Sequence, residues 1–240
     1  MKSLGRALGT WLLLVAAAAL ALQLFFVARI ALMAWVDPAS TTFQRSEAWR
    51  ILSTQGRLPW RQSWTPYEQI SVHLKRAVIA SEDDEFVRHD GVAWDAVQKA
   101  WKKNASAEAQ AQKRRSAPKV VGASTITQQL AKNLLLSGER TFVRKGQELV
   151  LTLTLEALLD KRRLLELYLN HVEWGEGVFG AEAAARHYFN KSAAQLSAGE
   201  AARLAVMLPR PRYFERLPQS GYLAGRSQII LGRMGAAAVP

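Results

Sequence analysis

The sequence contains no cysteine among its 240 residues. Disulfides and thiolate metal sites are therefore excluded, and the absence is compatible with an oxidising compartment without establishing one. Acidic residues are also scarce, with 20 Asp and Glu against 32 Lys and Arg, so the formal net charge is +12. A chain this basic beside a bilayer is attracted to anionic headgroups and to anionic lipid-linked substrates. Nucleic acid is the competing partner, but the N-terminal apolar run described below predicts that the main domain lies outside the cytoplasm, which argues against it.

The chain also lacks an alternating apolar and polar run of useful length after residue 65, which argues against a β-rich domain. Helix-start patterns are present instead, in which serine or threonine is followed three residues later by glutamate or glutamine, as in a capping box. These patterns lie at Thr65–Glu68, Thr125–Gln128, Ser192–Gln195 and Ser197–Glu200. We therefore predict a mainly α domain over residues 65–240, with a helix beginning at each pattern and Pro209 stopping the last one.

Two more helices are expected in the middle of this domain. Residues 144–158 are apolar nearly all round, which predicts a buried helix. Asp160 can cap the next helix, which we expect to end near Asn170. Residues 102–119 are different, because they are rich in Ala, Gln, Ser and Lys and carry six basic residues against one Glu. Their composition leaves a frayed helix, a mobile loop that closes over substrate and a solvated linker as open alternatives.

One long uncharged run stands near the N-terminus. It covers residues 7–28, and after Arg29 apolar residues resume from 30 to 36. A run of this length matches the ~30 Å hydrocarbon core of a bilayer. Lys2 and Arg6 precede it, so the positive-inside rule keeps the N-terminus cytoplasmic and sends the rest of the chain outside. The pattern predicts a single-pass protein of the cytoplasmic (inner) membrane, with its main domain on the periplasmic side.

A cleaved signal peptide is the alternative for this run. Residues 19–21, Ala-Leu-Ala, look like a small-residue cleavage site. Cleavage there would leave residues 22–35 as an apolar new N-terminus, which a secreted soluble protein would avoid. We therefore predict a cytoplasmic tail over residues 1–6, an uncleaved transmembrane anchor over 7–36 and a juxtamembrane segment over 37–64.

Tryptophan is interleaved with arginine in this juxtamembrane segment. The residues concerned are Trp49, Arg50, Arg57, Trp60, Arg61 and Trp64. Amphipathic rings beside cations are typical of a membrane interface. The same rings would equally serve to cover the core of the following domain, so both interpretations stay open.

The first candidate catalytic residue is Glu82. It follows Val78 by four residues and so continues the apolar stripe of Leu74 and Val78 on the buried face of a helix. Apolar surroundings and the neighbouring acids 83–85 are both expected to disfavour its charge and to raise its pKa, which suits a general base. The alternative is a helix-end acid that turns into solvent. His89, which follows in the next turn, is interpreted as a structural hydrogen-bonding residue.

The second candidate site is cationic and lies close to the helix start at Ser124 and Thr125. Its members are Lys132, Arg140, Arg144 and Lys145. Exposed backbone amides, a helix dipole and side-chain cations together suit a diphosphate. A solvated basic face is the alternative, and the spacing of Glu148 from Arg144 also permits a simple surface salt bridge. Behind a membrane anchor, a general base beside such a site indicates group transfer on a lipid-linked phosphate.

Five motifs resemble, in the same order, the signature motifs of the peptidoglycan glycosyltransferase family. They are Glu82–Gly91, Gly122–Gln129, Arg144–Glu148, Lys161–Asn170 and Gly177–Pro209. Class A penicillin-binding enzymes carry this module ahead of a transpeptidase domain. A chain that ends at Pro240 has no room for that domain, so we expect the monofunctional form. The resemblance implies a lysozyme-like, largely α fold with a small membrane-contacting jaw.

The resemblance also implies roles for individual residues. Glu82 matches the glutamate that deprotonates the GlcNAc 4-hydroxyl of the acceptor, lipid II, and Glu148 matches a second glutamate that assists or stabilises. The donor is the growing glycan on its undecaprenyl diphosphate. The substrate-binding positions implied are Gln129, Lys132, Asn133, Arg140 and Arg144. An α-linked donor and a β-1,4 product require inversion by direct displacement.

The cations of this site would suffice to neutralise the leaving diphosphate, so no cofactor is required, and a role for Mg²⁺ or Mn²⁺ is left open. The expected partners are lipid II, the lipid-linked nascent glycan, the membrane, and proteins of cell-wall synthesis or division. Two other functions stay as alternatives. One is a lysozyme-like murein hydrolase or lytic transglycosylase, which would also use a buried glutamate, and the other is a catalytically silent membrane scaffold.

Overall fold

The structure is a computed structural model that describes residues 2–114, 124–136, 138–139 and 141–240, and this part is mainly helical as predicted. The α-helices are α1 (Lys2–Leu32), α2 (Thr42–Gln55), α3 (Val72–Glu82), α4 (Trp94–Arg114), α5 (Ile126–Leu135), α6 (Phe142–Leu158), α7 (Lys161–His171), α8 (Ala181–Phe189), α9 (Ala198–Met207), α10 (Pro211–Arg216) and α11 (Gly221–Arg233). The 3-10 turns are η1 (Tyr67–Gln69), η2 (Ala193–Gln195) and η3 (Met234–Ala236), and the strands are β1 (Arg61–Gln62), β2 (Glu173–Gly175) and β3 (Val178–Phe179).

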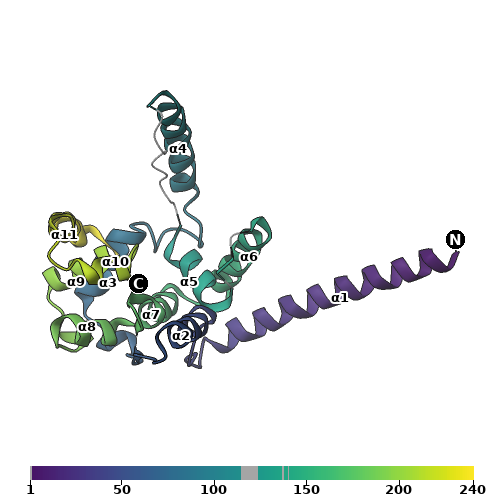
Figure 1. Cartoon of the computed structure of the whole chain (residues 1–240), viewed down its shortest axis with the longest axis horizontal. Helices are drawn as coiled ribbons and strands as arrows, with labels where there is room; N and C mark the ends of the chain where they lie inside the picture. The colour runs from purple at the N-terminus through teal and green to yellow at the C-terminus, as the bar shows by residue number, and fades with distance from the viewer. Residues whose placement is uncertain (1, 115–123, 137, 140) are drawn as a thin grey trace.

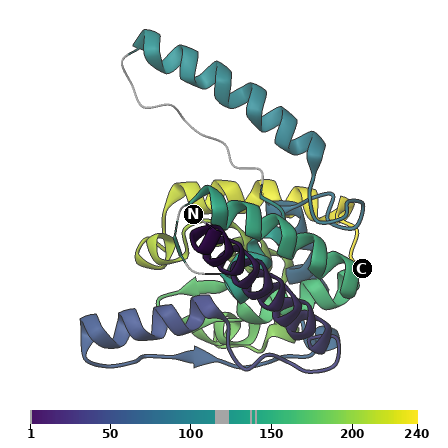
Figure 2. The same ribbon diagram turned by 90° about the vertical axis from the view of Figure 1, so that its right-hand side faces the viewer.

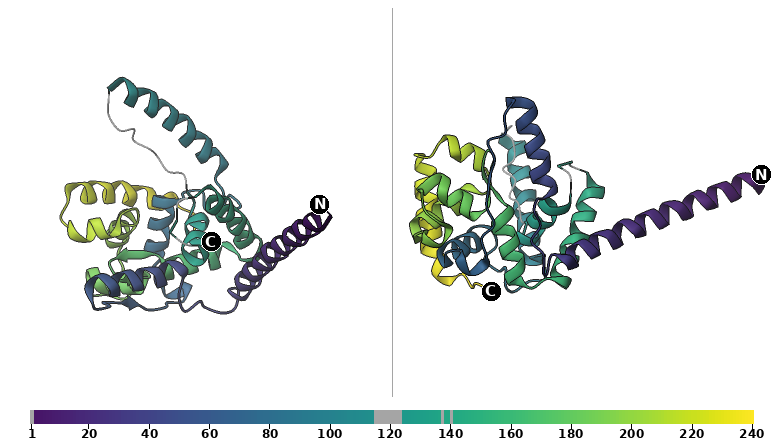
Figure 3. Two further views of the ribbon diagram at one scale, coloured as in Figure 1. Left: turned by 45° about the vertical axis from the view of Figure 1, so that its right-hand side comes forward. Right: turned by 90° about the horizontal axis from the view of Figure 1, so that it is seen from below.

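Two helices project from the helical body in different directions (Figure 1). One is α1 and the other is α4, and the left-hand view of Figure 3 shows the same separation. Within the body, α3 packs against α9 and α9 packs against α11, while α5 lies against α2, α6 and α7. The three short strands and α2 lie together on one side of the body (Figure 2). The core is therefore a stack of helices with a small sheet at its edge.

The stripe on α3 points into this core, as its spacing predicted. Leu74 and Val78 are both 0% exposed, and Ile70 just before the helix is 2% exposed. Because residues four apart lie on one helical face, this orientation directs the side chain of Glu82 toward the interior side of α3. Glu82 itself is half-buried at the last position of the helix.

Helix α1 contains a 28-residue stretch, Gly5–Leu32, that is long and apolar enough to cross a membrane. The helix ends at Leu32, whereas the predicted anchor continued to residue 36. The reason is that the last part of the apolar run joins the core of the domain, where Ile30 is 0% and Met33 is 3% exposed. The Arg163 side chain also donates a 2.7 Å hydrogen bond to the Met33 carbonyl, which fixes the turn after the helix.

Three of the predicted capping boxes are present, at Thr125, Ser192 and Ser197. The prediction that a helix begins at Thr65 is wrong. The side chain of Asn170 holds Thr65, accepting from its backbone N–H at 2.8 Å and donating to its carbonyl at 3.0 Å. The Thr65 backbone is therefore bound to α7 and does not start a helix. The helix that follows, α3, begins at Val72, where the Ser71 hydroxyl accepts a hydrogen bond from the His73 amide.

The predicted helix over residues 144–158 is α6, but the prediction of a buried helix is wrong, because only one face of α6 is buried. Its buried residues are Glu148, Leu151, Thr152 and Leu155, which form one face. On the opposite face, Val150 is 48% and Leu153 is 47% exposed. The difference arises because α6 lies at the margin of the body, against α5, α7 and α1, and nothing in the described part covers its outer side.

Residues 102–114 belong to α4, so within the described residues this segment is helical, and residues 115–119 lie outside them. The next predicted helix is also present, because Asp160 caps α7 by accepting from the Arg163 amide. The helix that begins at Ser197 is α9, which ends at Met207, two residues before Pro209.

The small sheet has the order β1-β3-β2, with β1 parallel and β2 antiparallel to β3. Gly177 allows the turn between β2 and β3 to lie close to the backbone of Pro59, just before β1. Its φ is +72°, and a Cβ there would lie 2.0 Å from the Pro59 carbonyl oxygen. The Arg61 amide donates to the Gly177 carbonyl at 2.8 Å, so this contact starts the pairing of β1 with β3.

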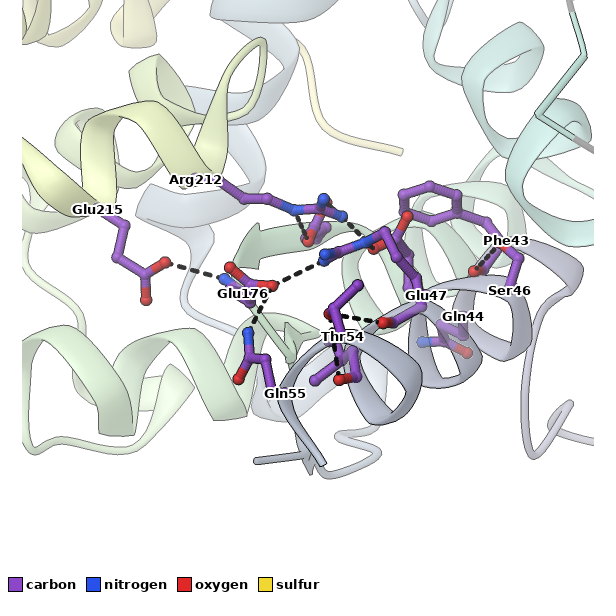
Figure 4. A network of polar contacts seen from close by, with 12 residues as sticks. Phe43, Gln44, Ser46, Glu47, Thr54, Gln55, Glu176, Arg212 and Glu215 are labelled. Carbon is purple, nitrogen blue, oxygen red and sulfur yellow. Dashed lines mark hydrogen bonds and ion pairs between the residues drawn. The ribbon is translucent and has the colours of Figure 1, made fainter. Parts of the chain in front are cut away.

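Ion pairs attach α2 to this sheet and to α10 (Figure 4). Arg50 on α2 contacts Glu47 at 2.7 Å and Glu176 at 2.8 Å, and Arg212 on α10 contacts Glu173 at 2.7 Å and also pairs with Glu47. The glutamates come from α2 and from the β2 region, so the arginines cross-link three elements. The predicted juxtamembrane segment, residues 37–64, is thus packed onto the domain through α2.

The tryptophans of that segment divide between the two interpretations offered for them. Trp60 stacks on Phe179, with ring centroids 4.6 Å apart, and Trp64 lies 5.7 Å from the ring of His171. These two rings cover the core. Trp49 is 72% exposed on α2 and is available to a surface outside the protein.

Candidate functional site

Glu82 lines a cavity of about 520 Å³. The cavity lies between the end of α3, the start of α5 and the first turns of α4. Its lining residues are Glu82, Asp83, Asp84, Glu85, Ala93, Asp95, Ala96, Lys99, Ala100, Lys103, Ser124 and Thr125. Three of the predicted site residues, Glu82, Ser124 and Thr125, therefore come together here.

A hydrogen-bonded chain from two helices fixes the Glu82 carboxylate. The Gln129 amide nitrogen on α5 donates to Glu82 Oε2 at 2.8 Å. The amide oxygen of Gln129 in turn accepts from the Tyr168 hydroxyl on α7 at 3.0 Å. Tyr168 is 1% exposed, so its hydroxyl is held at a single place in the core. Since a hydroxyl donates to the amide oxygen, the amide nitrogen must face Glu82.

Burial raises the pKa of Glu82 above its ordinary value. The hydrogen bond from Gln129 opposes this shift by stabilising the ionised form, and the charge of Asp83 adds to it. Desolvation is the largest cause, as predicted from the apolar stripe. A carboxylate with a raised pKa that opens onto a cavity is a stronger base than an exposed glutamate.

Asp83 joins the end of α3 to the start of α5. Its carboxylate accepts from the backbone N–H of Ile126 at 3.0 Å and from His89 Nε2 at 2.8 Å. His89 Nδ1 accepts from the Gly91 amide at 3.1 Å, so the proton of the neutral ring is on Nε2. His89 is thus a hydrogen-bonding residue, as interpreted from the sequence. The hydrogen bond from the Ile126 N–H to Asp83 also places the N-terminus of α5 directly beside Glu82.

The N-terminus of α5 is capped from within. The Thr125 hydroxyl accepts from the Gln128 amide, and the Gln128 side chain accepts from the Thr125 amide at 3.1 Å. The Thr125 hydroxyl also donates to the Gly91 carbonyl at 2.6 Å. Thr125 is 3% exposed, whereas Ser124 is exposed, so Ser124 is the more accessible of these two predicted substrate-binding residues.

The predicted cationic site is built around Glu148 on α6. Its carboxylate accepts from the Arg144 guanidinium at 2.7 Å and also pairs with the Lys145 ammonium. Glu148 is 3% exposed, so this is not the surface salt bridge considered as an alternative. The side chain of Lys145 is 54% exposed and that of Arg144 is 16% exposed. Glu148 therefore holds two cations at the margin of the body, with the lysine facing outward.

Lys132 and Asn133 lie on α5, three and four residues after Gln129. That spacing places them on the same face of the helix as Gln129, one turn further on. Lys132 is exposed and Asn133 is half-buried. Helix α5 packs directly against α6, so one helix carries the contact to Glu82 and packs beside the cations held by Glu148. The predicted Arg140 lies outside the described residues.

Two features of the site were not predicted. Tyr168 lies in the predicted helix ending near Asn170, and only the packing of α7 against α5 brings its hydroxyl to Gln129. Lys99 and Lys103 line the cavity from α4, although no pattern in the sequence distinguishes them from other lysines. Their i, i+4 spacing would have placed them on one face but not against Glu82. No group of three or more His, Asp or Glu side chains suited to a metal occurs among the residues described.

Comparison with known proteins gives a consistent result. The sequence model of the family described as Transglycosylase matches residues 50–235. A biosynthetic peptidoglycan transglycosylase of Burkholderia thailandensis is 53% identical over 226 residues, covering 94% of this chain and 84% of that protein. Proteins of the same name from Paraburkholderia xenovorans and Bordetella pertussis are 52% and 51% identical. They cover 94% and 91% of this chain, and 90% and 88% of their own lengths.

Proposed function

Because this chain belongs to the transglycosylase family, we propose that it polymerises the glycan strands of peptidoglycan for the cell wall, with Glu82 as the general base. Its substrate is lipid II, and its products are a β-1,4-linked glycan and undecaprenyl diphosphate. The observation that carries the proposal is the Glu82 carboxylate, which has a raised pKa, a fixed orientation and access to a cavity.

In the proposed reaction, Glu82 removes the proton from the 4-hydroxyl of the acceptor's GlcNAc. The acceptor oxygen then forms a bond to C1 of the donor sugar while the bond from C1 to the diphosphate oxygen breaks. The electron pair of that bond leaves with the diphosphate, and the configuration at C1 inverts. A single displacement needs one base and a stabilised leaving group, without an enzyme nucleophile. General-base assistance of this kind typically contributes about 10²–10⁴-fold in rate.

The leaving diphosphate is proposed to meet the cations near α5 and α6. Arg144 and Lys145 are already positioned by Glu148, and Lys132 lies on the neighbouring helix. Charge-assisted contacts of this kind stabilise the negative charge that develops on the leaving group. Glu148 then acts by holding the cations, which is the stabilising role expected for it. We propose that no cofactor is required.

Helix α1 suits a single-pass membrane anchor. With Lys2 and Arg6 ahead of the uncharged run of residues 7–28, the proposed orientation places the N-terminus in the cytoplasm and the domain on the outer face of the inner membrane. The lipid-linked substrate would be supplied in that same membrane. Proteins of cell-wall synthesis or division are the proposed protein partners.

The test is to supply lipid II to the full chain purified in detergent and to separate the products by length. The proposal predicts glycan chains and release of one undecaprenyl diphosphate for each bond formed. Purified sacculi are offered in a parallel reaction. Cleavage of sacculi without consumption of lipid II would contradict the proposal and would favour a murein hydrolase. Binding of lipid II without turnover would favour a catalytically silent scaffold.

A further inference from the structure

The cavity beside Glu82 extends onto the base of α4, which contributes two cations to it. Lys99 and Lys103 line the cavity, whereas Lys102, on the same helix, does not. Residues four apart on a helix lie on one face with about 5–6 Å between their Cβ atoms. The two ammonium groups can therefore reach one ligand. Helix α4 projects from the body (Figure 1), and its first turns form one wall of the cavity.

In the described part of the chain, none of the five acidic residues of the cavity wall forms an ion pair with these lysines. Asp83 is engaged by His89 and by the Ile126 amide. Among the other acids of the wall, Asp84 pairs with Arg233 at 2.9 Å and Glu85 pairs with Arg88 at 3.5 Å. Glu82 is hydrogen-bonded to Gln129, and Asp95 is exposed at the first turn of α4.

Within the described part of the chain, neither Lys99 nor Lys103 has an ion-pair partner, so both charges remain available to a ligand. This pair is separate from the cations that Glu148 holds. Arg144, Lys145 and Lys132 do not line the cavity of Glu82. The structure thus presents one group of cations on α5 and α6, and another on α4 beside the general base.

The proposed reaction likewise involves two diphosphates with different fates. The donor loses its diphosphate, while the acceptor keeps its own after its 4-hydroxyl has reacted. Because the acceptor hydroxyl must reach Glu82, the rest of the acceptor lies in the same cavity or at its mouth.

We propose that Lys99 and Lys103 bind the diphosphate that the acceptor retains, and so direct the acceptor's 4-hydroxyl toward Glu82. This inference rests on the proposed function and assigns a substrate-binding role to α4. The lysines act on acceptor binding and positioning, whereas Glu82 acts on the proton. A sugar acceptor that lacks the diphosphate gains nothing from them.

The experiment compares two acceptors in single-transfer reactions in detergent. The donor is lipid-linked and has its terminal 4-hydroxyl blocked, so that it cannot serve as acceptor. One acceptor is lipid II, and the other is the same disaccharide-peptide with an alkyl group at C1 in place of the lipid diphosphate. The enzymes are the parent, a Lys99→Ala/Lys103→Ala double variant, and Lys102→Ala as the control for an equivalent exposed charge on α4.

For the double variant, kcat/KM with lipid II as acceptor is expected to fall by roughly ten-fold or more, mainly through KM, since charged hydrogen bonds contribute at least this much. With the alkyl acceptor, the double variant and the parent should agree within about two-fold, because that acceptor makes no contact with the lysines. Lys102→Ala should match the parent with both acceptors. Alanine favours helix, so α4 is expected to persist, and circular dichroism checks this.

If the double variant lost kcat/KM equally with both acceptors, the inference would be overturned. It would also be overturned if Lys102→Ala lost as much kcat/KM with lipid II as the double variant does. If the parent transfers to lipid II and the double variant keeps its preference for the diphosphate-bearing acceptor, the inference fails while the proposed function stands. If the parent transfers to neither acceptor, the proposed function fails first.

Discussion

Replacement of Tyr168 by phenylalanine tests how the site maintains the orientation of Glu82. The variant keeps the buried ring and removes only the hydroxyl that donates to Gln129 at 3.0 Å. Without that donor, only Glu82 orients the Gln129 amide, and the carboxylate oxygen can lose its 2.8 Å hydrogen bond. Because this hydrogen bond lowers the pKa of Glu82, its loss lets desolvation raise the pKa further.

The size of the effect follows from the value of one hydrogen bond. A net contribution of about 1 kcal/mol corresponds to roughly five-fold in an equilibrium constant. At acidic pH, where most Glu82 is protonated, kcat/KM is proportional to the small ionised fraction. Tyr168→Phe should therefore lower kcat/KM about five-fold on the acidic limb, whereas on the alkaline plateau, where Glu82 is ionised in both enzymes, the difference should be small.

Tyr188→Phe is the matched control. Its hydroxyl donates to the Trp174 carbonyl at 2.7 Å, away from Glu82. Both variants lose one buried hydrogen bond and should lose about 1 kcal/mol in the free energy of unfolding. Only Tyr168→Phe should change the pH profile of lipid II polymerisation, and in a Gln129→Leu background it should have no further effect. Superimposable profiles for Tyr168→Phe and the parent would refute the reasoning, as would an equal displacement by Tyr188→Phe.

Three further predictions concern stability. Glu82→Gln should raise the melting temperature at pH 8, since the raised pKa of Glu82 means that its ionised form costs folding energy there; the gain should vanish below the ordinary value of 4.5, where both side chains are neutral. Burial lowers the pKa of His171 from 6.5 to about 4. The free energy of unfolding should therefore fall by up to about 3 kcal/mol as the pH drops from 6.5 toward 4, because the unfolded chain binds the proton first. Denaturant titrations at several pH values measure this, and His171→Leu should remove the dependence. Gly177→Ala should lose at least about 1–3 kcal/mol, because of its positive φ and the contact with Pro59; an unchanged urea midpoint would contradict this.

Features of this protein that depend on residues close in sequence were predictable, whereas those that depend on contacts between distant residues were not. The buried stripe of α3 and the desolvation of Glu82 depend on residues four apart, and both were predictable. The cap at Thr125 is equally local. The helix start expected at Thr65 failed because Asn170, distant in the sequence, holds the Thr65 backbone. A local pattern cannot show that a remote side chain competes for the same amide.

The parts of the site that were missed depend on how helices pack. Tyr168 becomes part of the site only because α7 lies against α5, which aligns its hydroxyl with Gln129. The lysines of α4 meet the cavity because that helix starts beside Glu82. For α6, the exposure of Val150 on the outer face likewise follows from its place at the margin of the body. Helical periodicity predicts which residues share one face of a helix, but it does not predict which element packs against that face.

The most direct measurement is the turnover of lipid II by Glu82→Gln, with Glu68→Gln as the control for the same substitution at an exposed acid outside the cavity. The glutamine keeps the size of the side chain and its hydrogen bond to Gln129, but it cannot accept the acceptor's proton. We predict that turnover falls by at least about 100-fold, with lipid II still bound, while the control polymerises like the parent. Polymerisation by Glu82→Gln at a rate close to that of the parent would contradict the assignment of Glu82 as the general base.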